Sequence, residues 1–382
     1  MRSYLTESAE QLSQGGIRAF FDKAAAYKNT INLGIGEPAQ HTPEAIIEAA
    51  VSAAQMGYTH YSANAGFLDV RHEVASYLKG FDLDYDPKGE IVITCGGMGA
   101  LALVLSCTVD TGTGVLIQDP QWVNYSSQVR FLGGKVIHVE VEEEENYVLK
   151  AEQIRKSITD QTKILLINSP NNPTGAVLSQ EELSAIAEVA IENDLLVISD
   201  EVYCELVYNG RHHSIASLPG MKERTCVINS FSKSFAMTGW RIGFAAGPRR
   251  LIKKMTILQE NYFSCANTLG QKAGAYALHT RCGLDEMKES YRRKRDLVCD
   301  VLDHFPKVSY SKPEGAFYIF MNISKCGCTS LEMADRLLKE TGVITVPGSS
   351  FGSKGEGHLR LSYAGSDENL LEALHRMEPL LS

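Results

Sequence analysis

The stretch TCVINSFSKSFAMTGWRIGFAAG, residues 225–247, contains two apolar runs separated by a polar turn. The runs at 225–230 and 241–247 are short and bounded by turn residues, which is typical of buried strands. Similar runs precede them at 90–94, 115–118, 135–139, 163–168 and 195–199. Helical patterns lie between these runs. Strands that alternate with helices predict an α/β fold: a large domain with a seven-stranded, mostly parallel sheet covered by helices.

The C-terminal part of the chain has a different pattern. From about residue 268 a long helical stretch runs to Val301. Short strands and helices then alternate, at about 316–321, 331–341, 343–346, 358–362 and 367–380. This pattern predicts a smaller α+β domain, and we expect the first 40 or so residues to join it. The predicted division is an N-terminal arm at 1–40, a large cofactor-binding domain at 41–275 and a small domain at 276–382.

Composition limits the classes of function. The chain has 382 residues, of which 44% are hydrophobic and 22% charged, and this length suits two domains packed together. Its formal net charge is −9. Nucleic acids and anionic membranes are bound by clustered Lys and Arg, so we expect neither partner.

The cysteines and the N-terminus indicate where the protein works. The nine cysteines are odd in number and irregular in spacing, which favours a reducing compartment. Cys326 and Cys328 have no second pair at zinc-ligand spacing, so we predict no metal site. The N-terminus lacks the apolar segment of a signal peptide, and no apolar run reaches the roughly 20 residues of a membrane span. We therefore expect a cytoplasmic protein.

Polar residues follow the predicted strands directly. Ligands of open α/β sheets bind at the carboxyl ends of the strands, so these residues are expected to meet at one edge. The segments concerned are Gly96–Ala100, Asp119–Trp122, Ser169–Gly175, Asp200–Tyr203 and Ser230–Ser234.

The glycine-rich segment supports two interpretations. Residues 97–102 match G-x-G-x-x-A between a strand and a helix, and Asp119 lies 20 residues after Gly99. This is the pattern of a dinucleotide-binding loop and keeps a nicotinamide-dependent dehydrogenase as an alternative. However, the N-terminus of a helix binds any phosphate, so the loop also suits a monophosphate cofactor.

Lys233 favours the second interpretation. It follows a buried strand among Ser230, Ser232 and Ser234, with Arg241 eight residues further on. Serines and an arginine can hold a phosphate dianion. A lysine beside such a site is what the covalent attachment of pyridoxal 5'-phosphate requires.

Asp200 and Trp122 complete the candidate site. Asp200 ends an apolar strand, where a carboxylate is costly unless it is paired, and the cationic pyridine nitrogen of the cofactor is a suitable partner. The alternative is a helix N-cap. Trp122 is placed either to stack on the cofactor ring or to pack in the core.

Longer motifs now show a family resemblance. The chain resembles the class I/II aminotransferases of fold type I in nearly its whole length, and within them the bacterial aspartate, aromatic and N-acetyl-diaminopimelate aminotransferases. The motifs that carry the resemblance are GEP at 36–38, NNPTG at 171–175, DEVY at 200–203, SFSKSFAMTGWRIGF at 230–244 and HLRLSYA at 358–364.

The resemblance implies a role for each site residue. Lys233, Asp200 and Tyr203 are implied to be catalytic. The cofactor-binding residues are implied to be Tyr61, Gly97, Met98, Trp122, Asn172, Asp200, Tyr203, Ser230, Ser232, Lys233 and Arg241. Arg360, with Asn172 and Gly36, is implied to bind the substrate α-carboxylate. Tyr61 is implied to reach the phosphate of the neighbouring subunit, which makes the protein a homodimer with shared active sites.

The implied reaction moves an amino group from an L-amino acid to a 2-oxo acid such as 2-oxoglutarate. A pyridoxal-phosphate lyase on the same fold, such as a C–S lyase, remains an alternative, because the two chemistries separate only after a shared step. A fused transcription regulator would need a DNA-binding module, and the residues before Leu33 leave no room for one. The sequence does not identify the amino donor.

Overall fold

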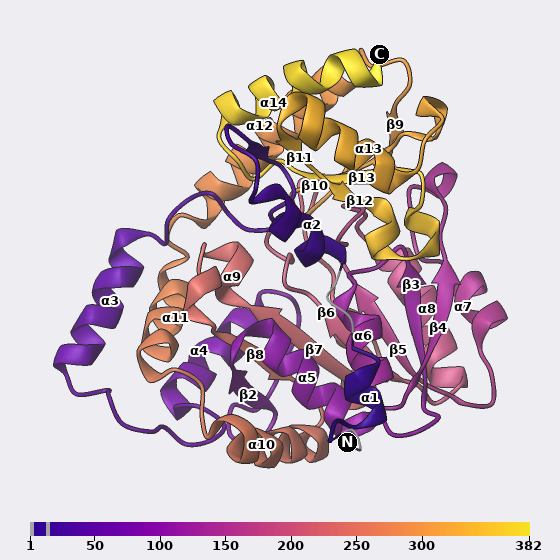
Figure 1. The fold of residues 1–382 in the computed structure, drawn as a ribbon. Coiled ribbons are helices and arrows are strands. Elements are labelled where there is room, and N and C mark those ends of the chain that lie inside the picture. Colours follow the sequence, from indigo (N-terminus) through magenta and orange to yellow (C-terminus); the bar gives the residue numbers. More distant parts are fainter. Residues whose placement is uncertain (1–3, 13–15) are drawn as a thin grey trace.

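The computed structural model describes residues 4–12 and 16–382. Its centre is a seven-stranded sheet in the order β2-β8-β7-β6-β5-β3-β4 (Figure 1). Only β8 runs against its neighbours, so the predicted mostly parallel α/β sheet is confirmed. The strands are β2 (Ile91–Thr94), β3 (Gly114–Asp119), β4 (Lys135–Glu140), β5 (Thr162–Asn168), β6 (Leu196–Asp200), β7 (Thr225–Ser230) and β8 (Gly243–Ala246).

The start of β8 differs from the sequence prediction by two residues, whereas the other boundaries of the large sheet differ by at most one. The run at 241–247 was expected to be extended from its first residue, but β8 begins at Gly243. Arg241 has a left-handed backbone with φ of 56° and ends a short 3₁₀ turn, Thr238–Trp240. A left-handed residue cannot continue a strand. This turn lets Arg241 face the cavity described below.

Helices cover both faces of the sheet, because its strands are apolar on both sides. Alternate residues of β5 show this: Ile164 and Leu166 belong to one apolar cluster, and Leu165 and Ile167 to another. The first cluster is closed by α5 (Gly96–Thr108), α6 (Asn124–Phe131) and α10 (Arg249–Phe263), and the second by α7 (Ala151–Ser157) and α8 (Gln180–Glu192). Beside the β2 end lie α3 (Glu44–Gln55), α4 (Leu68–Lys79) and α11 (Thr268–Thr280) (Figure 1).

A second layer forms the top of the molecule in Figure 1. Its antiparallel sheet has the order β12-β13-β10-β9, and a parallel pair joins β1 to β11. The strands are β1 (Ile31–Asn32), β9 (Ser309–Tyr310), β10 (Tyr318–Asn322), β11 (Val343–Ile344), β12 (Val346–Pro347) and β13 (His358–Ser362). The helices around them are α2 (Gly16–Ala24), α12 (Leu284–Leu302), α13 (Ser330–Arg336) and α14 (Asp367–Leu381).

The pairing of β1 with β11 brings the two ends of the chain together. Ile31 lies opposite Val343 and Asn32 opposite Ile344. A segment near the N-terminus therefore packs with the C-terminal layer. The predicted domain boundaries near residues 40 and 275 stay predictions.

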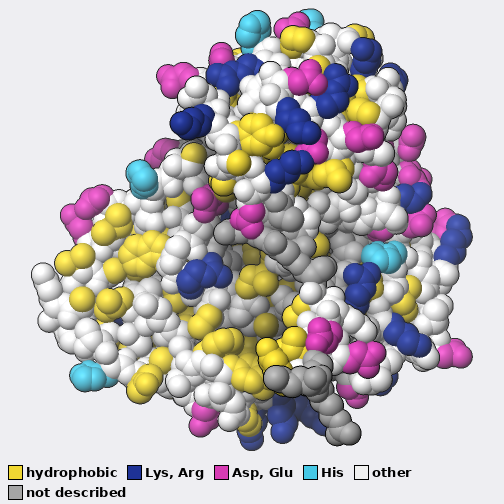
Figure 2. All heavy atoms as spheres, in the orientation of Figure 1, with side chains coloured by type: hydrophobic (Ala, Val, Ile, Leu, Met, Phe, Trp, Pro, Cys, Tyr) yellow, Lys and Arg dark blue, Asp and Glu magenta, His cyan; other side chains and the backbone are white. Residues whose placement is uncertain are grey.

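Hydrophobic side chains gather on one part of the surface. Figure 2 shows them over the region where Figure 1 places α3, α10 and α11. Exposed apolar residues in or beside these helices are Val51, Met56, Tyr61, Ile257, Tyr262, Phe263 and Tyr276. Large exposed apolar surfaces of this kind mark sites of protein association.

Candidate active site

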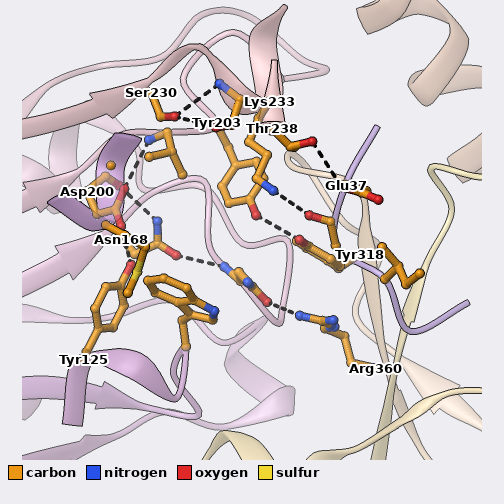
Figure 3. Close-up of a pocket in the computed structure, with 18 of the residues that line it drawn as sticks. Glu37, Tyr125, Asn168, Asp200, Tyr203, Ser230, Lys233, Thr238, Tyr318 and Arg360 are labelled. Carbon is orange, nitrogen blue, oxygen red and sulfur yellow. Dashed lines mark hydrogen bonds between the residues drawn. The ribbon is translucent and has the colours of Figure 1, made fainter. Parts of the chain in front are cut away.

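A cavity of about 350 Å³ lies between the two layers, at the carboxyl ends of the strands of the large sheet. This volume suits a small cofactor or substrate. The predicted site residues that line it are Gly36, Gly97, Met98, Trp122, Asn172, Asp200, Tyr203, Ser230, Ser232, Lys233, Arg241 and Arg360. Figure 3 shows how residues from both layers point into it.

Tyr61 is the predicted site residue that does not line this cavity. Tyr61 is 85% exposed. Within a single chain Tyr61 therefore has no role in the cavity, and its predicted contribution to a neighbouring subunit stays a prediction.

Lys233 lies in the short helix α9 (Phe231–Ser234), which directly follows β7. Ser230 caps this helix, because its side chain accepts a hydrogen bond from the backbone N–H of Ser232. The Nζ of Lys233 donates to the backbone oxygen of Gly36. Burial lowers the pKa of Lys233 to about 8, and the carboxylate of Glu37 opposes that shift. Near neutral pH this amine is therefore much closer to a proton-accepting state than a surface lysine.

Asp200 ends β6 and is only 5% exposed. Its Oδ2 accepts a 2.6 Å hydrogen bond from the hydroxyl of Tyr125, and its Oδ1 a longer one, 3.3 Å, from the backbone N–H of Val202. Burial raises the pKa of Asp200 to about 6, although these two hydrogen bonds favour the ionised form. A carboxylate in this position is ready to pair with a cation.

An anion-binding corner lies beside Lys233. The N-terminal turn of α5, with Gly97 and Met98, faces the cavity, and free N–H groups at a helix N-terminus attract anions. The hydroxyls of Ser230 and Ser232 lie 2.8 Å apart at its rim. Arg241 completes the corner.

Gly96 makes room for that arginine. Gly96 has φ of 76°, and a Cβ there would lie 2.6 Å from an Nη of Arg241. Only glycine permits both this backbone and this close approach.

Arg360 lies on the opposite side of the cavity, on β13, and is 3% exposed. Its Nη1 donates to the Oδ1 of Asn172 at 2.9 Å and its Nη2 to the backbone oxygen of Gly34 at 2.6 Å. The guanidinium lies over the rings of Tyr318 and Phe351, at 4.4 Å and 4.9 Å. These contacts fix its plane.

Several residues of the cavity were not predicted from the sequence. Tyr125 contacts Asp200, and the hydroxyl of Tyr318 lies 2.8 Å from that of Tyr203. Asn168 donates to the backbone oxygen of Asp200 and accepts from the backbone N–H of Asn172. The signal for Tyr125 was present, because it lies only three residues after Trp122, which was already a candidate. Tyr318 has no such signal, since it comes from the other layer.

The dinucleotide interpretation of Asp119 is wrong. Its carboxylate is fully buried and does not line the cavity. Its Oδ2 accepts from the backbone N–H of Ser353 at 3.1 Å and from the Ser353 hydroxyl at 2.7 Å. Asp119 thus joins the two layers and is not available to a ribose. The spacing from Gly99 was fortuitous.

The residues of the cavity fit pyridoxal phosphate. Arg241 and the α5 N-terminus suit a phosphate, and Asp200 suits a ring nitrogen that carries a proton. The buried Nε of Arg360 has no hydrogen-bond partner among the described residues, as expected of a site built to receive an anion. Together with a buried lysine of lowered pKa, this arrangement defines an enzyme of the pyridoxal-phosphate class.

Comparisons with known proteins define the family. Residues 28–377 match the family model of aminotransferase class I and II. Aromatic-amino-acid aminotransferase 2 of Thermococcus litoralis and aspartate aminotransferase of Pyrococcus abyssi are each 44% identical over 384 residues, covering 99% of this chain and 98% of the relative. A mutant aspartate aminotransferase of Thermus thermophilus has a similar structure, with a TM-score of 0.95 at 38% identity and 100% of both chains covered.

The chain belongs to the class I and II aminotransferases. It is therefore an enzyme that uses pyridoxal phosphate to transfer an amino group between an amino acid and a 2-oxo acid, as the sequence predicted. The mostly parallel α/β fold agrees with that of its structural neighbours. In the described part of the chain, no helix is both long and apolar enough to cross a membrane.

Proposed function

We propose that Lys233 attaches the cofactor and moves protons during transfer, with Asp200 as the partner of the ring nitrogen. The observation that carries this assignment is the convergence of these two groups, each with a shifted pKa, on one cavity. When bound, the cofactor supplies a conjugated ring that withdraws electrons from the α-carbon of the donor. The residues of the chain hold that ring, orient the donor and move the proton.

Lys233 acts as the base. A pKa of about 8 leaves roughly a tenth of the Nζ unprotonated at pH 7 and about half at pH 8, and a base whose pKa lies near the working pH transfers protons efficiently. Because the Nζ lies next to the anion-binding corner, it would accept the α-proton of the donor and later deliver a proton to the bound cofactor. The hydrogen bond to Gly36 keeps this nitrogen on the substrate side.

Arg360 and Asn172 bind the α-carboxylate. A guanidinium held flat by two aromatic rings presents a planar fork to a carboxylate. The amide oxygen of Asn172 accepts from Arg360, so its NH₂ group is left free to donate and, with the hydroxyl of Tyr203, would hold the cofactor when it is bound. Trp122 forms the wall on which the ring stacks. The backbone of Gly36 completes the carboxylate site.

The walls of the cavity favour an aromatic donor. Beyond the α-carboxylate site they include Phe21, Ile35, Met98 and Trp122. The cations that line the described cavity, Lys233, Arg241 and Arg360, already have roles. A side-chain carboxylate would need a cation from outside this cavity. The relative from Thermococcus litoralis is named for aromatic amino acids, which agrees with this proposal.

The active enzyme is a cytoplasmic homodimer in this proposal. The exposed Tyr61 and the apolar surface around it support association of two copies, because such a surface is costly to leave in water. Tyr61 would then bind the cofactor phosphate of the partner subunit.

A donor screen tests the proposed function. The protein is loaded with cofactor and supplied with 2-oxoglutarate and single amino acids, and each 2-oxo product is identified. We expect phenylalanine and tyrosine to give a kcat/KM at least as high as that of aspartate. Release of ammonia or sulfide in place of a new amino acid would show a lyase. A strong preference for aspartate would contradict the proposed aromatic preference and would mean that a cation from outside this cavity reaches the donor side chain.

A further inference from the structure

Tyr125 makes a direct contact with the carboxylate proposed to hold the cofactor ring. It lies on α6 and is 2% exposed, and its hydroxyl donates to the Oδ2 of Asp200 at 2.6 Å (Figure 3). A hydrogen bond from a neutral hydroxyl to an ionised carboxylate is short and strong. The two residues come from different elements, so this contact exists only in the folded chain.

The two oxygens of Asp200 are unequally satisfied. Oδ2 has the short bond from Tyr125, whereas Oδ1 has only the 3.3 Å contact with the backbone N–H of Val202. The other charged or titratable groups that act on Asp200 are Glu201, Lys233 and Tyr203. Oδ1 therefore has the greater remaining capacity to accept a proton donor. A protonated pyridine nitrogen is such a donor.

We propose that Tyr125 is a positioning residue, which turns one oxygen of Asp200 toward the pyridine nitrogen and keeps the carboxylate ionised, so that the proton stays on the ring. This proposal rests on the role assigned to Asp200 above. It adds a specific function for a side chain that the cofactor itself need not touch.

The chemistry of a tyrosine suits this task. A lysine or arginine at this position would neutralise the carboxylate and weaken its attraction for the ring nitrogen. A phenol stays neutral here, because burial and the neighbouring Asp200 raise the pKa of Tyr125 well above its ordinary value. Tyr125 thus lowers the basicity of Asp200 without removing its charge.

The turn that leads into α6 also sets the ring wall. Trp122 and Tyr125 are in edge contact, with centroids 5.3 Å apart and planes at 82°. One segment therefore fixes both the surface on which the ring lies and the carboxylate at its nitrogen. Movement of this turn would displace both together.

The test uses the holoenzyme with cofactor labelled at the ring nitrogen with ¹⁵N. In the Tyr125→Phe variant Asp200 becomes more basic, so the ¹⁵N signal should move from the protonated toward the neutral position. Exchange of the donor α-proton should slow roughly 10- to 100-fold, the effect of one hydrogen bond to a charged group, with little change in KM.

Tyr310→Phe is the matched control. It removes a tyrosine hydroxyl that donates to Asp303, also at 2.6 Å, in the other layer. We expect its ¹⁵N signal and exchange rate to equal those of the unchanged enzyme. An unshifted ¹⁵N signal in Tyr125→Phe overturns the proposal, even if activity falls, because the loss would then be structural. If Asp200→Asn also left the signal in its protonated position, the proposed role of Asp200 itself would fail.

A second variant covers the case in which Tyr125→Phe does not fold. Replacing Tyr125 by 3-fluorotyrosine keeps the shape of the side chain and makes the hydroxyl a stronger donor. The pKa of Asp200, followed in the cofactor-free chain by its infrared carboxyl band, should then be lower than in the unchanged protein measured in the same way. An unchanged pKa contradicts the proposal.

Discussion

Replacement of Arg360 by lysine separates recognition of the α-carboxylate from recognition of the donor side chain. Arg360 donates to Asn172 and to the backbone oxygen of Gly34, and two rings hold its plane. Lysine keeps the charge but has no planar fork. The Arg360→Lys variant therefore tests geometry rather than charge.

The size of the effect follows from the lost bond. One of the two hydrogen bonds in an arginine–carboxylate fork is lost, which costs about 1.5–3 kcal/mol. This corresponds to a fall of roughly 10- to 150-fold in kcat/KM. Because every donor and acceptor carries the α-carboxylate, the fall should be nearly the same for all of them.

Steady-state kinetics with phenylalanine, aspartate and 2-oxoglutarate measure this effect. The control is Arg295→Lys: Arg295 is also buried, at 6% exposed, and lies over the ring of Tyr208, but it does not line the cavity. We expect Arg295→Lys to lower stability and to leave KM unchanged. A defect of Arg360→Lys confined to dicarboxylic substrates would refute this account and make Arg360 a specificity residue.

Three further predictions concern assembly, pH and the contact between layers. Mixed dimers of Lys233→Ala and Tyr61→Ala chains should be more active than the average of the two parents at limiting cofactor, because one site of each hybrid is intact. In the cofactor-free protein, burial raises the pKa of Asp200 from its ordinary 3.8 to about 6. The free energy of unfolding should therefore be highest below pH 4, where Asp200 is protonated in both states, and should fall as the pH rises through 6. Urea denaturation at several pH values should show this fall as about 3 kcal/mol in the unchanged protein, and the Asp200→Asn variant should not show it. Ser353→Ala removes the 2.7 Å bond to Asp119 and should cost about 1–2 kcal/mol in the same assay.

The sequence predicted the large sheet well, because its strands are buried on both faces and form continuous apolar runs. All seven predicted strands are present, and each of the five polar segments that were expected to meet at the sheet edge contributes at least one residue to the cavity. Lys233 and Asp200 could be selected as candidate site residues from chemistry alone, since each is a charged group at the end of a buried strand, and both line the cavity.

Other features depend on contacts that the sequence does not encode locally. Tyr318 reaches the cavity from the other layer, and its hydroxyl meets Tyr203 across 115 positions of the chain. Asp119 had the spacing of a ribose-binding acid, but the fold places Ser353 against it. The left-handed backbone of Arg241 moved the start of β8, since a local rule for strands cannot foresee a turn stabilised by its surroundings.

Reduction with borohydride tests whether Lys233 carries the cofactor. The purified protein, loaded with pyridoxal phosphate, is reduced, digested and analysed by mass spectrometry. We expect one modified peptide, with the pyridoxyl group on Lys233, and no stable adduct in Lys233→Ala. A pyridoxyl group on any other lysine of the unchanged protein, or a protein that takes up no cofactor, would contradict this expectation.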